Sequence, residues 1–269
     1  MLSAMAETMA FGDGQLIVTP MAWNAVRIQY VANGNVASAL LASDLPEWLY
    51  VGEGEKVRKG EGEKAGEGIA VDVDAQRQIL TVKDRAGRTV FTATSHQMHA
   101  TEATLAFESP ADEFLFGLGQ FQDGYSNLRG LSRRLTQVNT QISIPMLMSS
   151  KGYGVLWNNY GQTDFNPADR SVTLTKRNGS GASEEVNVTS TEGGRREVRE
   201  RNIFEAFLDI PETGDYALLL NVGQKMARRH NLVIDGKAVI EMQNLWLPPT
   251  ASAIVHLSAG RHTLSAELT

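Results

Sequence analysis

The 269-residue sequence contains no cysteine, only five histidines and no long apolar run. Without cysteine the chain forms neither disulfides nor thiolate metal sites, and thiol catalysis is excluded. No apolar run approaches the roughly 18 residues that a membrane-spanning helix requires, so we expect no membrane span. Acidic residues outnumber basic ones, because the sequence has 31 Asp and Glu but only 25 Lys and Arg. The resulting net charge of −6 argues against a nucleic-acid partner.

What the sequence does contain is an alternation of apolar and polar residues with a period of two. Val26, Ile28 and Tyr30 alternate with polar residues, which predicts a strand with one buried face. One hairpin is predicted over 79–94, and a second joins 232–234 to 238–240 through Asp235-Gly236, a pair suited to a type I′ turn. Further candidate strands are Leu16–Thr19, Leu105–Glu108, Phe114–Leu118, Ile142–Met148, Gly154–Asn158, Val172–Lys176, Phe204–Ile210, Tyr216–Val222, Ile254–Leu257 and Thr263–Leu268.

Helical periodicity is rare, and only Val36–Ala42 is predicted as a short helix. Many short strands separated by glycine-rich turns favour β-sandwiches over a parallel α/β sheet. Residues 52–68 consist largely of Gly, Glu and Lys and are predicted to form a solvated loop. Residues 178–202 carry Arg and Glu in balance and are predicted to be an exposed linker between domains at 1–177 and 203–269.

No motif for catalysis or metal binding is present. His96 and His99 would face opposite sides of a strand, and His256 and His262 lie at the two ends of a predicted hairpin, so no metal site or cofactor is predicted. The sequence also lacks nucleophile-elbow and Walker motifs. Candidate acid/base carboxylates exist, but their spacing fixes no pair at the roughly 5–10 Å that glycoside hydrolysis needs. They are Asp112, Glu113, Asp123, Asp164 and Asp169. We therefore assign no catalytic residue.

Residues 116–130 form a dense block of polar and aromatic side chains. Planar amides, a carboxylate, a guanidinium and aromatic rings are the groups that bind sugars, because polar groups bind hydroxyls and rings cover apolar sugar faces. Gln122, Asp123 and Tyr125 are the candidate substrate-binding residues of this block. The alternative is a turn-rich connection in which Gln and Asn side chains satisfy backbone groups.

This block and the segments around it resemble the N-terminal region of glycoside hydrolase family 31, most closely its α-xylosidases and α-glucosidases. The similar segments are Phe116–Gly124, Asn127–Gly130, Gln137–Gln141, Ile144–Met148, Lys151–Tyr160 and Thr163–Phe165, with Leu16–Pro20 and Ala25–Gln29 resembling the opening strands. Segments Phe204–Leu208, Gly214–Tyr216, Leu232–Lys237 and Leu257–His262 are similar to a protective-antigen-type domain inserted in some α-xylosidases. The resemblance implies an all-β fold, a galactose-mutarotase-like β-sandwich followed by a partial second β-sandwich.

The resemblance also implies a retaining α-glycosidase acting on α-linked oligosaccharides. In that family the catalytic carboxylates lie on a (β/α)8 barrel, and the nucleophile occupies a Trp-x-Asp-Met-Asn-Glu type motif that is absent here. The chain is therefore expected to be a non-catalytic N-terminal part, with an oligosaccharide and the missing catalytic barrel of the same polypeptide as partners. A sandwich loop that lines the substrate site carries Asp-Thr in many relatives, and the matching Asn139-Thr140 is implied to bind substrate. A capped turn before the strand at Ile142 explains this pair equally well.

Two other functions fit the sequence: a stand-alone carbohydrate-binding or adhesive module, and an unrelated small hydrolase that uses unpaired carboxylates. The cellular compartment is open. Ala4-Met5-Ala6 matches the end of an export signal, which would place the protein in the periplasm or outside the cell if an upstream part is missing. Otherwise the protein is expected in the cytoplasm.

Overall fold

A computed structural model describes residues 7–21, 25–32, 69–99, 102–158, 161–179, 181–191, 193–223, 229–243 and 248–268. The described residues form antiparallel strands and no helix, so they include no helix that could cross a membrane. The predicted all-β class is confirmed. The chain divides into two compact units, one within Met1–Asp112 with Lys151–Tyr153 and one within Glu113–Ser150 with Gly154–Thr269.

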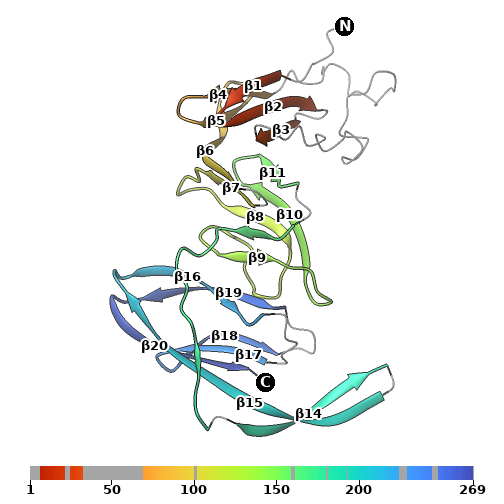
Figure 1. The fold of residues 1–269 in the computed structure, drawn as a ribbon, viewed down its shortest axis with the longest axis vertical. Helices are drawn as coiled ribbons and strands as arrows, with labels where there is room; N and C mark the ends of the chain where they lie inside the picture. The colour runs from red at the N-terminus through yellow and green to blue at the C-terminus, as the bar shows by residue number, and fades with distance from the viewer. Residues whose placement is uncertain are drawn as a thin grey trace. The chain divides into compact units, whose positions relative to one another are not determined.

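The described residues of the first unit form two antiparallel sheets, with strand orders β1-β2-β3 and β4-β5-β6-β7 (Figure 1). An aromatic cluster lies in this unit, where the His96 ring packs 4.6 Å from the ring of Phe11 and 4.9 Å from that of Tyr30. His96 therefore has a packing role. The strands are β1 (Glu7–Phe11), β2 (Gly14–Met21), β3 (Ala25–Ala32), β4 (Ile69–Asp74), β5 (Ile79–Asp84), β6 (Thr89–His99) and β7 (Glu102–Phe107).

In the part of the second unit that the structure describes there are four sheets, with strand orders β11-β10-β8, β12-β9, β16-β19 and β13-β15-β20-β17-β18, and β14 pairs with β15. Its strands are β8 (Leu115–Gln120), β9 (Arg133–Leu135), β10 (Ile142–Ser149), β11 (Gly154–Leu156), β12 (Thr163–Phe165), β13 (Thr175–Lys176), β14 (Ala182–Ser190), β15 (Gly193–Ile210), β16 (Gly214–Asn221), β17 (Arg229–Ile234), β18 (Lys237–Gln243), β19 (Thr250–Leu257) and β20 (Gly260–Leu268).

A hydrophobic core joins the two C-terminal sheets into a sandwich. Leu220 of β16 and Ala253 of β19 pack in one cluster with Leu232, Ile240 and Ala266 of the larger sheet. A second cluster contains Ile210, Ile234 and Leu257. These buried side chains alternate with less buried ones along their strands, which is how two sheets bury one face each against the other.

Both predicted hairpins are confirmed. β5 and β6 pair on either side of a turn that contains Gly87 at φ 77°, and β17 pairs with β18 around Asp235-Gly236. Asp235 and Gly236 have φ values of 47° and 80°, the positive values that a type I′ turn requires. The other predicted strands all overlap observed ones, although Val172–Lys176 does so only at Thr175–Lys176 (β13), because period-two patterns are local and survive in the fold.

His262 attaches the Asp235-Gly236 turn to the neighbouring strand β20. Its Nε2 lies 2.8 Å from the Ser258 carbonyl oxygen and its Nδ1 lies 2.5 Å from Asp235 Oδ2. Both ring nitrogens therefore face acceptors, which favours the doubly protonated ring. The hydrogen bond to Ser258, followed by that to Asp235, raises the pKa of His262. The hydrogen bond from His262, followed by that from the Thr263 amide, lowers the pKa of Asp235.

These two shifts predict a pH dependence of stability. The contribution of His262 is complete below its unfolded pKa of about 6.5 and is lost as pH rises through the higher folded pKa. The contribution of Asp235 is present above its unfolded pKa and is lost as pH falls through the lower folded one. We expect His262→Gln to abolish the loss of stability on the alkaline side in urea denaturation measured at a series of pH values.

Several predictions need correction or lie outside the described residues. Residues 178–202, predicted as a linker, contain β14 and the first half of β15, which form a long hairpin. The linker was predicted from residue composition, which does not reveal the alternation of valine and polar residues along these strands. His256 and His262 do not flank a hairpin, because β19 pairs with β16 whereas β20 pairs with β15 and β17. The helix at Val36–Ala42 and the loop at 52–68 lie outside the described residues.

The β11-β10-β8 sheet presents an apolar surface on one face. Met148 lies directly opposite Phe116 across the β10–β8 pair, so their side chains share a face. The exposed apolar side chains of these strands are Phe116, Ile142, Ile144, Met148 and Leu156, of which Met148 is 53% exposed. Exposed apolar patches mark sites of contact with a protein, a membrane or a ligand, or surfaces prone to aggregation.

Candidate functional site

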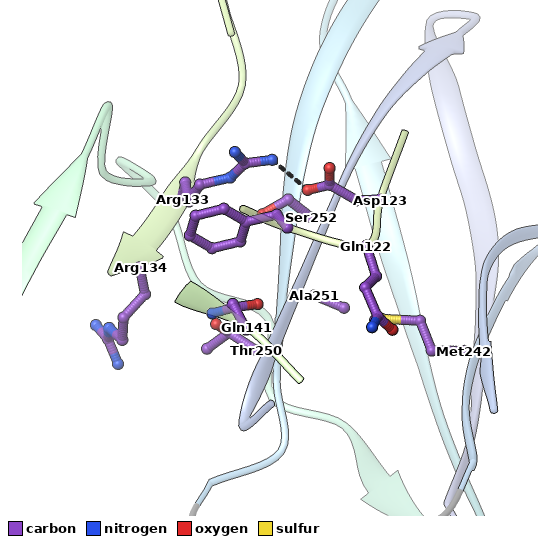
Figure 2. Close-up of a pocket in the computed structure, with 10 residues that line it drawn as sticks. Gln122, Asp123, Arg133, Arg134, Gln141, Met242, Thr250, Ala251 and Ser252 are labelled. Atoms are coloured by element: carbon purple, nitrogen blue, oxygen red, sulfur yellow. Dashed lines mark hydrogen bonds and ion pairs between the residues drawn. The ribbon is translucent and has the colours of Figure 1, made fainter. Parts of the chain in front are cut away.

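A small pocket lies in the second unit, where the polar-aromatic block meets the C-terminal sandwich. The block contributes the residues that follow β8, β9 contributes two arginines, and the first residues of β19 form the opposite side (Figure 2). Its volume is comparable to about one ordered water molecule, so the pocket does not enclose a sugar ring. The lining residues are Phe121, Gln122, Asp123, Arg133, Arg134, Gln141, Met242, Thr250, Ala251 and Ser252.

A buried ion pair between Arg133 and Asp123 is the main electrostatic feature of this pocket. Arg133 Nη2 donates to Asp123 Oδ2, and Figure 2 shows the two side chains pointing toward each other. The Arg133 side chain is only 3% exposed and that of Asp123 is 12% exposed. The Arg133 guanidinium also lies over the Phe121 ring, with Cζ 3.8 Å from the ring centroid. Because water is excluded from most of the pair, loss of one partner would leave a buried charge.

Arg133 has one unsatisfied donor at this pocket. Its buried Nε has no hydrogen-bond partner among the described residues. Gln141, at the same pocket, is 5% exposed and donates from Nε2 to the Thr136 carbonyl oxygen at 2.6 Å. A pocket of this size, with a buried donor, is suited to an ordered water that completes the hydrogen bonds of Arg133.

A second arginine pair lies beside the first and is more exposed. Arg134 donates from Nε and Nη2 to the two carboxylate oxygens of Asp164, at 2.8 and 3.0 Å, across the β9–β12 pair. Both side chains are about a quarter exposed, at 27% and 26%. The hydrogen bond to Asp164 raises the pKa of Arg134. This bidentate pair links two short strands.

Two hydrogen bonds attach the polar-aromatic block to β19. Tyr125 Oη accepts from the Ile254 amide at 2.8 Å, and Ser252 Oγ donates to the Ser132 carbonyl oxygen at 2.6 Å. The Tyr125 hydroxyl, predicted to contact substrate, is therefore engaged with backbone. Asp123 is engaged in the same way, because its Oδ1 accepts from the Tyr125 amide at 3.3 Å while its Oδ2 pairs with Arg133.

We expect Tyr125→Phe to lower stability by about 1–2 kcal/mol, because the Ile254 amide loses its acceptor at a half-buried position. Urea denaturation measures this loss. Tyr216→Phe is a matched control, because the Tyr216 hydroxyl donates to the exposed Glu212 carbonyl oxygen, which water can replace. A Tyr125→Phe variant as stable as the Tyr216→Phe variant would contradict the structural role of Tyr125.

Asn139 and Thr140 lie in a tight turn just before β10. The Val138 amide donates to the Gln141 carbonyl oxygen at 3.2 Å, and the Gln141 amide donates to the Val138 carbonyl oxygen at 3.1 Å. Asn139 is exposed and Thr140 is half-buried, and neither lines the pocket, although the next residue, Gln141, does. Gln122 is exposed at the pocket opening. Sugar binding by these residues stays a prediction.

The candidate acid/base carboxylates are mostly engaged in structural contacts. Asp112 pairs with Lys151 at 2.5 Å, Glu113 is 2% exposed and accepts from Ser149 Oγ, and Asp164 pairs with Arg134. Asp169 lies exposed in a loop. The described residues contain no group of three or more His, Asp or Glu side chains arranged to hold a metal ion.

Sequence reasoning missed the residues that organise this site. Arg133, Arg134 and Gln141 were not singled out, and Phe121 was only one member of an aromatic block. The single local signal was the adjacent pair of arginines at 133 and 134 in a segment otherwise suited to turns. Their partners lie 10 and 30 residues away in the sequence, so only the folded chain reveals the pairs.

The fold and the site together define an all-β protein of antiparallel sheets whose polar-aromatic block is fixed to a C-terminal sandwich. No protein-family model matches the chain. The chain is 47% identical over 66 residues to an uncharacterised family 31 glucosidase of Pseudescherichia vulneris, which covers 24% of this chain and 12% of that relative. It is 33% identical over 111 residues to an α-xylosidase of Saccharolobus solfataricus, which covers 36% of this chain and 15% of that relative.

A solved structure resembles this fold over almost the whole chain. The crystal structure of the family 31 α-xylosidase from Xanthomonas citri matches with a TM-score of 0.61 and 19% sequence identity, over 99% of this chain and 34% of that one. The predicted resemblance to glycoside hydrolase family 31 is thus confirmed. The chain spans about a third of the length of the solved structure and less of the two curated relatives. The protective-antigen-type assignment stays a prediction.

Proposed function

We propose that this chain is the non-catalytic N-terminal β-sandwich region of a retaining α-glycosidase of the α-xylosidase or α-glucosidase type, acting on α-linked oligosaccharides. The observation that carries the proposal is the 33% identity over 111 residues to an α-xylosidase. The match of fold to a second α-xylosidase over 99% of the chain supports it. In this proposal a catalytic barrel of the same polypeptide supplies the chemistry.

The geometry of the pocket supports a positioning role. The Arg133–Asp123 pair holds the polar-aromatic block against β9, and the Tyr125–Ile254 hydrogen bond attaches the block to β19. Exposed polar groups on this rigid base, the side chains of Gln122 and Asn139, can then meet sugar hydroxyls at defined positions. We therefore assign Gln122, Asn139 and Thr140 to sugar contact. Asp123 and Tyr125 hold the block in place.

The genomic sequence downstream of residue 269 is the first test. The proposal expects the reading frame to run on into a barrel with a Trp-x-Asp-Met-Asn-Glu type motif. The 269-residue chain alone should leave p-nitrophenyl α-xyloside and α-glucoside intact, while the product of the longer frame should hydrolyse one of them. Hydrolysis by the purified 269-residue chain would overturn the non-catalytic assignment.

Asn139→Ala in the longer product tests the sugar contact. Loss of one hydrogen bond to substrate should raise KM about tenfold without unfolding the protein. Asn178→Ala, in an exposed turn, is the matched control and should leave KM unchanged. Two results together would favour the stand-alone carbohydrate-binding module instead. The reading frame would contain no barrel, and the 269-residue chain would bind glycans in a way that Asn139→Ala abolishes.

A further inference from the structure

Gln141 is a buried polar side chain to which the proposed function gives no role. It is only 5% exposed, and its Nε2 donates to the Thr136 carbonyl oxygen at 2.6 Å. Burying an amide side chain costs free energy unless the amide is hydrogen bonded, so the contact with Thr136 compensates for this burial. Because the donor and the acceptor lie at the two ends of the segment 136–141, their hydrogen bond closes this segment into a loop.

The loop that Gln141 closes carries Asn139 and Thr140. Within it the Val138 amide donates to the Gln141 carbonyl oxygen at 3.2 Å, and the Gln141 amide donates to the Val138 carbonyl oxygen at 3.1 Å. These hydrogen bonds form an isolated antiparallel bridge, which leaves Asn139 and Thr140 at the tip of the turn. The backbone and the side chain of Gln141 therefore restrain the loop at Val138 and at Thr136.

The same residue connects this turn to the polar-aromatic block. Gln141 lines the pocket together with Gln122 of the block, and Figure 2 shows both side chains among the lining residues. The next residue, Ile142, pairs with Gln120 at the end of β8, just before the residues of the block that line the pocket. The turn and the block therefore meet at Gln141 and its neighbour, although they are distant in the sequence.

We propose that Gln141 is a positioning residue that holds Asn139 and Thr140 in the conformation in which they contact a sugar. This inference rests on the proposed function, which assigns the sugar contact to these two residues. Gln141 itself is buried and engaged with Thr136, so it acts through the turn and not on the sugar. A loop that is fixed before its ligand arrives loses less conformational entropy on binding, and this preorganisation raises affinity.

Amide hydrogen exchange of the 269-residue chain tests the first half of this inference without any sugar. Gln141→Met keeps the size of the side chain and removes its donor, so the amides of residues 138 and 141 should exchange at least about tenfold faster. The Leu128 amide, which donates from the block to the Leu115 carbonyl oxygen at 2.7 Å, should keep its rate. Gln137→Met makes the same change at an exposed position of the same loop and should leave all three rates unchanged.

The kinetics of the longer product test the second half. Gln141→Met should raise KM about tenfold and leave kcat within about twofold, because the turn contributes to binding and not to bond cleavage. Gln141→Asn, whose shorter side chain does not reach Thr136, should have the same effect. When Gln141→Met is combined with Asn139→Ala, KM should rise much less than the product of the two single effects, since Gln141 acts through Asn139. Fully multiplicative effects would assign Gln141 a general structural role and overturn the proposal.

The outcomes separate this inference from the proposed function. Unchanged exchange at residues 138 and 141 would overturn the positioning role whatever the function of the chain. A KM that rises in Asn139→Ala but not in Gln141→Met would also overturn it, while leaving the sugar contact in place. Faster exchange in Gln141→Met with an unchanged KM in both variants would overturn the sugar contact itself, and the positioning role with it. A longer product that hydrolyses neither substrate would overturn the proposed function directly and this inference as well.

Discussion

Arg133→Met should lower the free energy of unfolding by about 3 kcal/mol, measured by urea denaturation. The Arg133 side chain is 3% exposed and pairs with Asp123, so its removal leaves a carboxylate with little access to water. The contact between the guanidinium and the Phe121 ring is lost at the same time. This variant is expected to have one of the two largest effects on stability.

Arg134→Met is the matched control in the adjacent position. Its pair with Asp164 is about a quarter exposed, and partly solvated pairs contribute about 1 kcal/mol or less. Combining Arg133→Met with Asp123→Leu should recover part of the loss, because the orphaned carboxylate is removed as well. Equal losses in the Arg133 and Arg134 variants would contradict the assignment of Arg133–Asp123 as the buried pair that holds the block.

Gly119→Ala should be at least as damaging, with a loss of about 3 kcal/mol or more. Gly119 has φ +105°, and a Cβ added there would collide with the carbonyl oxygen of Ile142 on the paired strand β10. The backbones of β8 and β10 approach each other so closely at Gly119 that no side chain fits between them. The expected result is weakened β8–β10 pairing, seen as a lower urea midpoint.

Gly124→Ala separates backbone strain from this collision. Gly124 has φ +78°, and an added Cβ would meet no atom within 4 Å. Its cost should therefore be only about 1 kcal/mol, the usual penalty of a left-handed conformation for a residue with a Cβ. If both variants lost the same stability, the close approach of β10 to Gly119 would not be the cause.

The fold could be predicted from the sequence wherever its cause is local. The Asp235-Gly236 turn depends on the conformational preferences of two neighbouring residues, and the structure confirms it. The hairpin of 182–201 was missed because its composition resembles a loop, although Val186, Val188 and Val198 keep a strand-like alternation with polar residues. The hairpin expected between His256 and His262 was wrong, because adjacency in sequence does not decide which sheet a strand joins.

The candidate site was predicted in outline only. The polar-aromatic block was identified, and Gln122 and Asp123 do line the pocket. The functions of individual side chains could not be predicted, because they depend on partners distant in the sequence. Tyr125 is hydrogen bonded to Ile254, 129 residues further along the chain, and Ser252 to Ser132, 120 residues away.

The sequence by itself determined the all-β class, the local turns and the resemblance to family 31 glycoside hydrolases, because alternation, turn residues and similar segments are all encoded locally. Only the tertiary structure decided which polar residues are buried in structural contacts and which are exposed. Arg133 and Asp123 are charged residues that any composition argument places on the surface, yet the packing of the block against β19 buries them together. Burial and pairing are properties of the folded chain, since they depend on which strands meet.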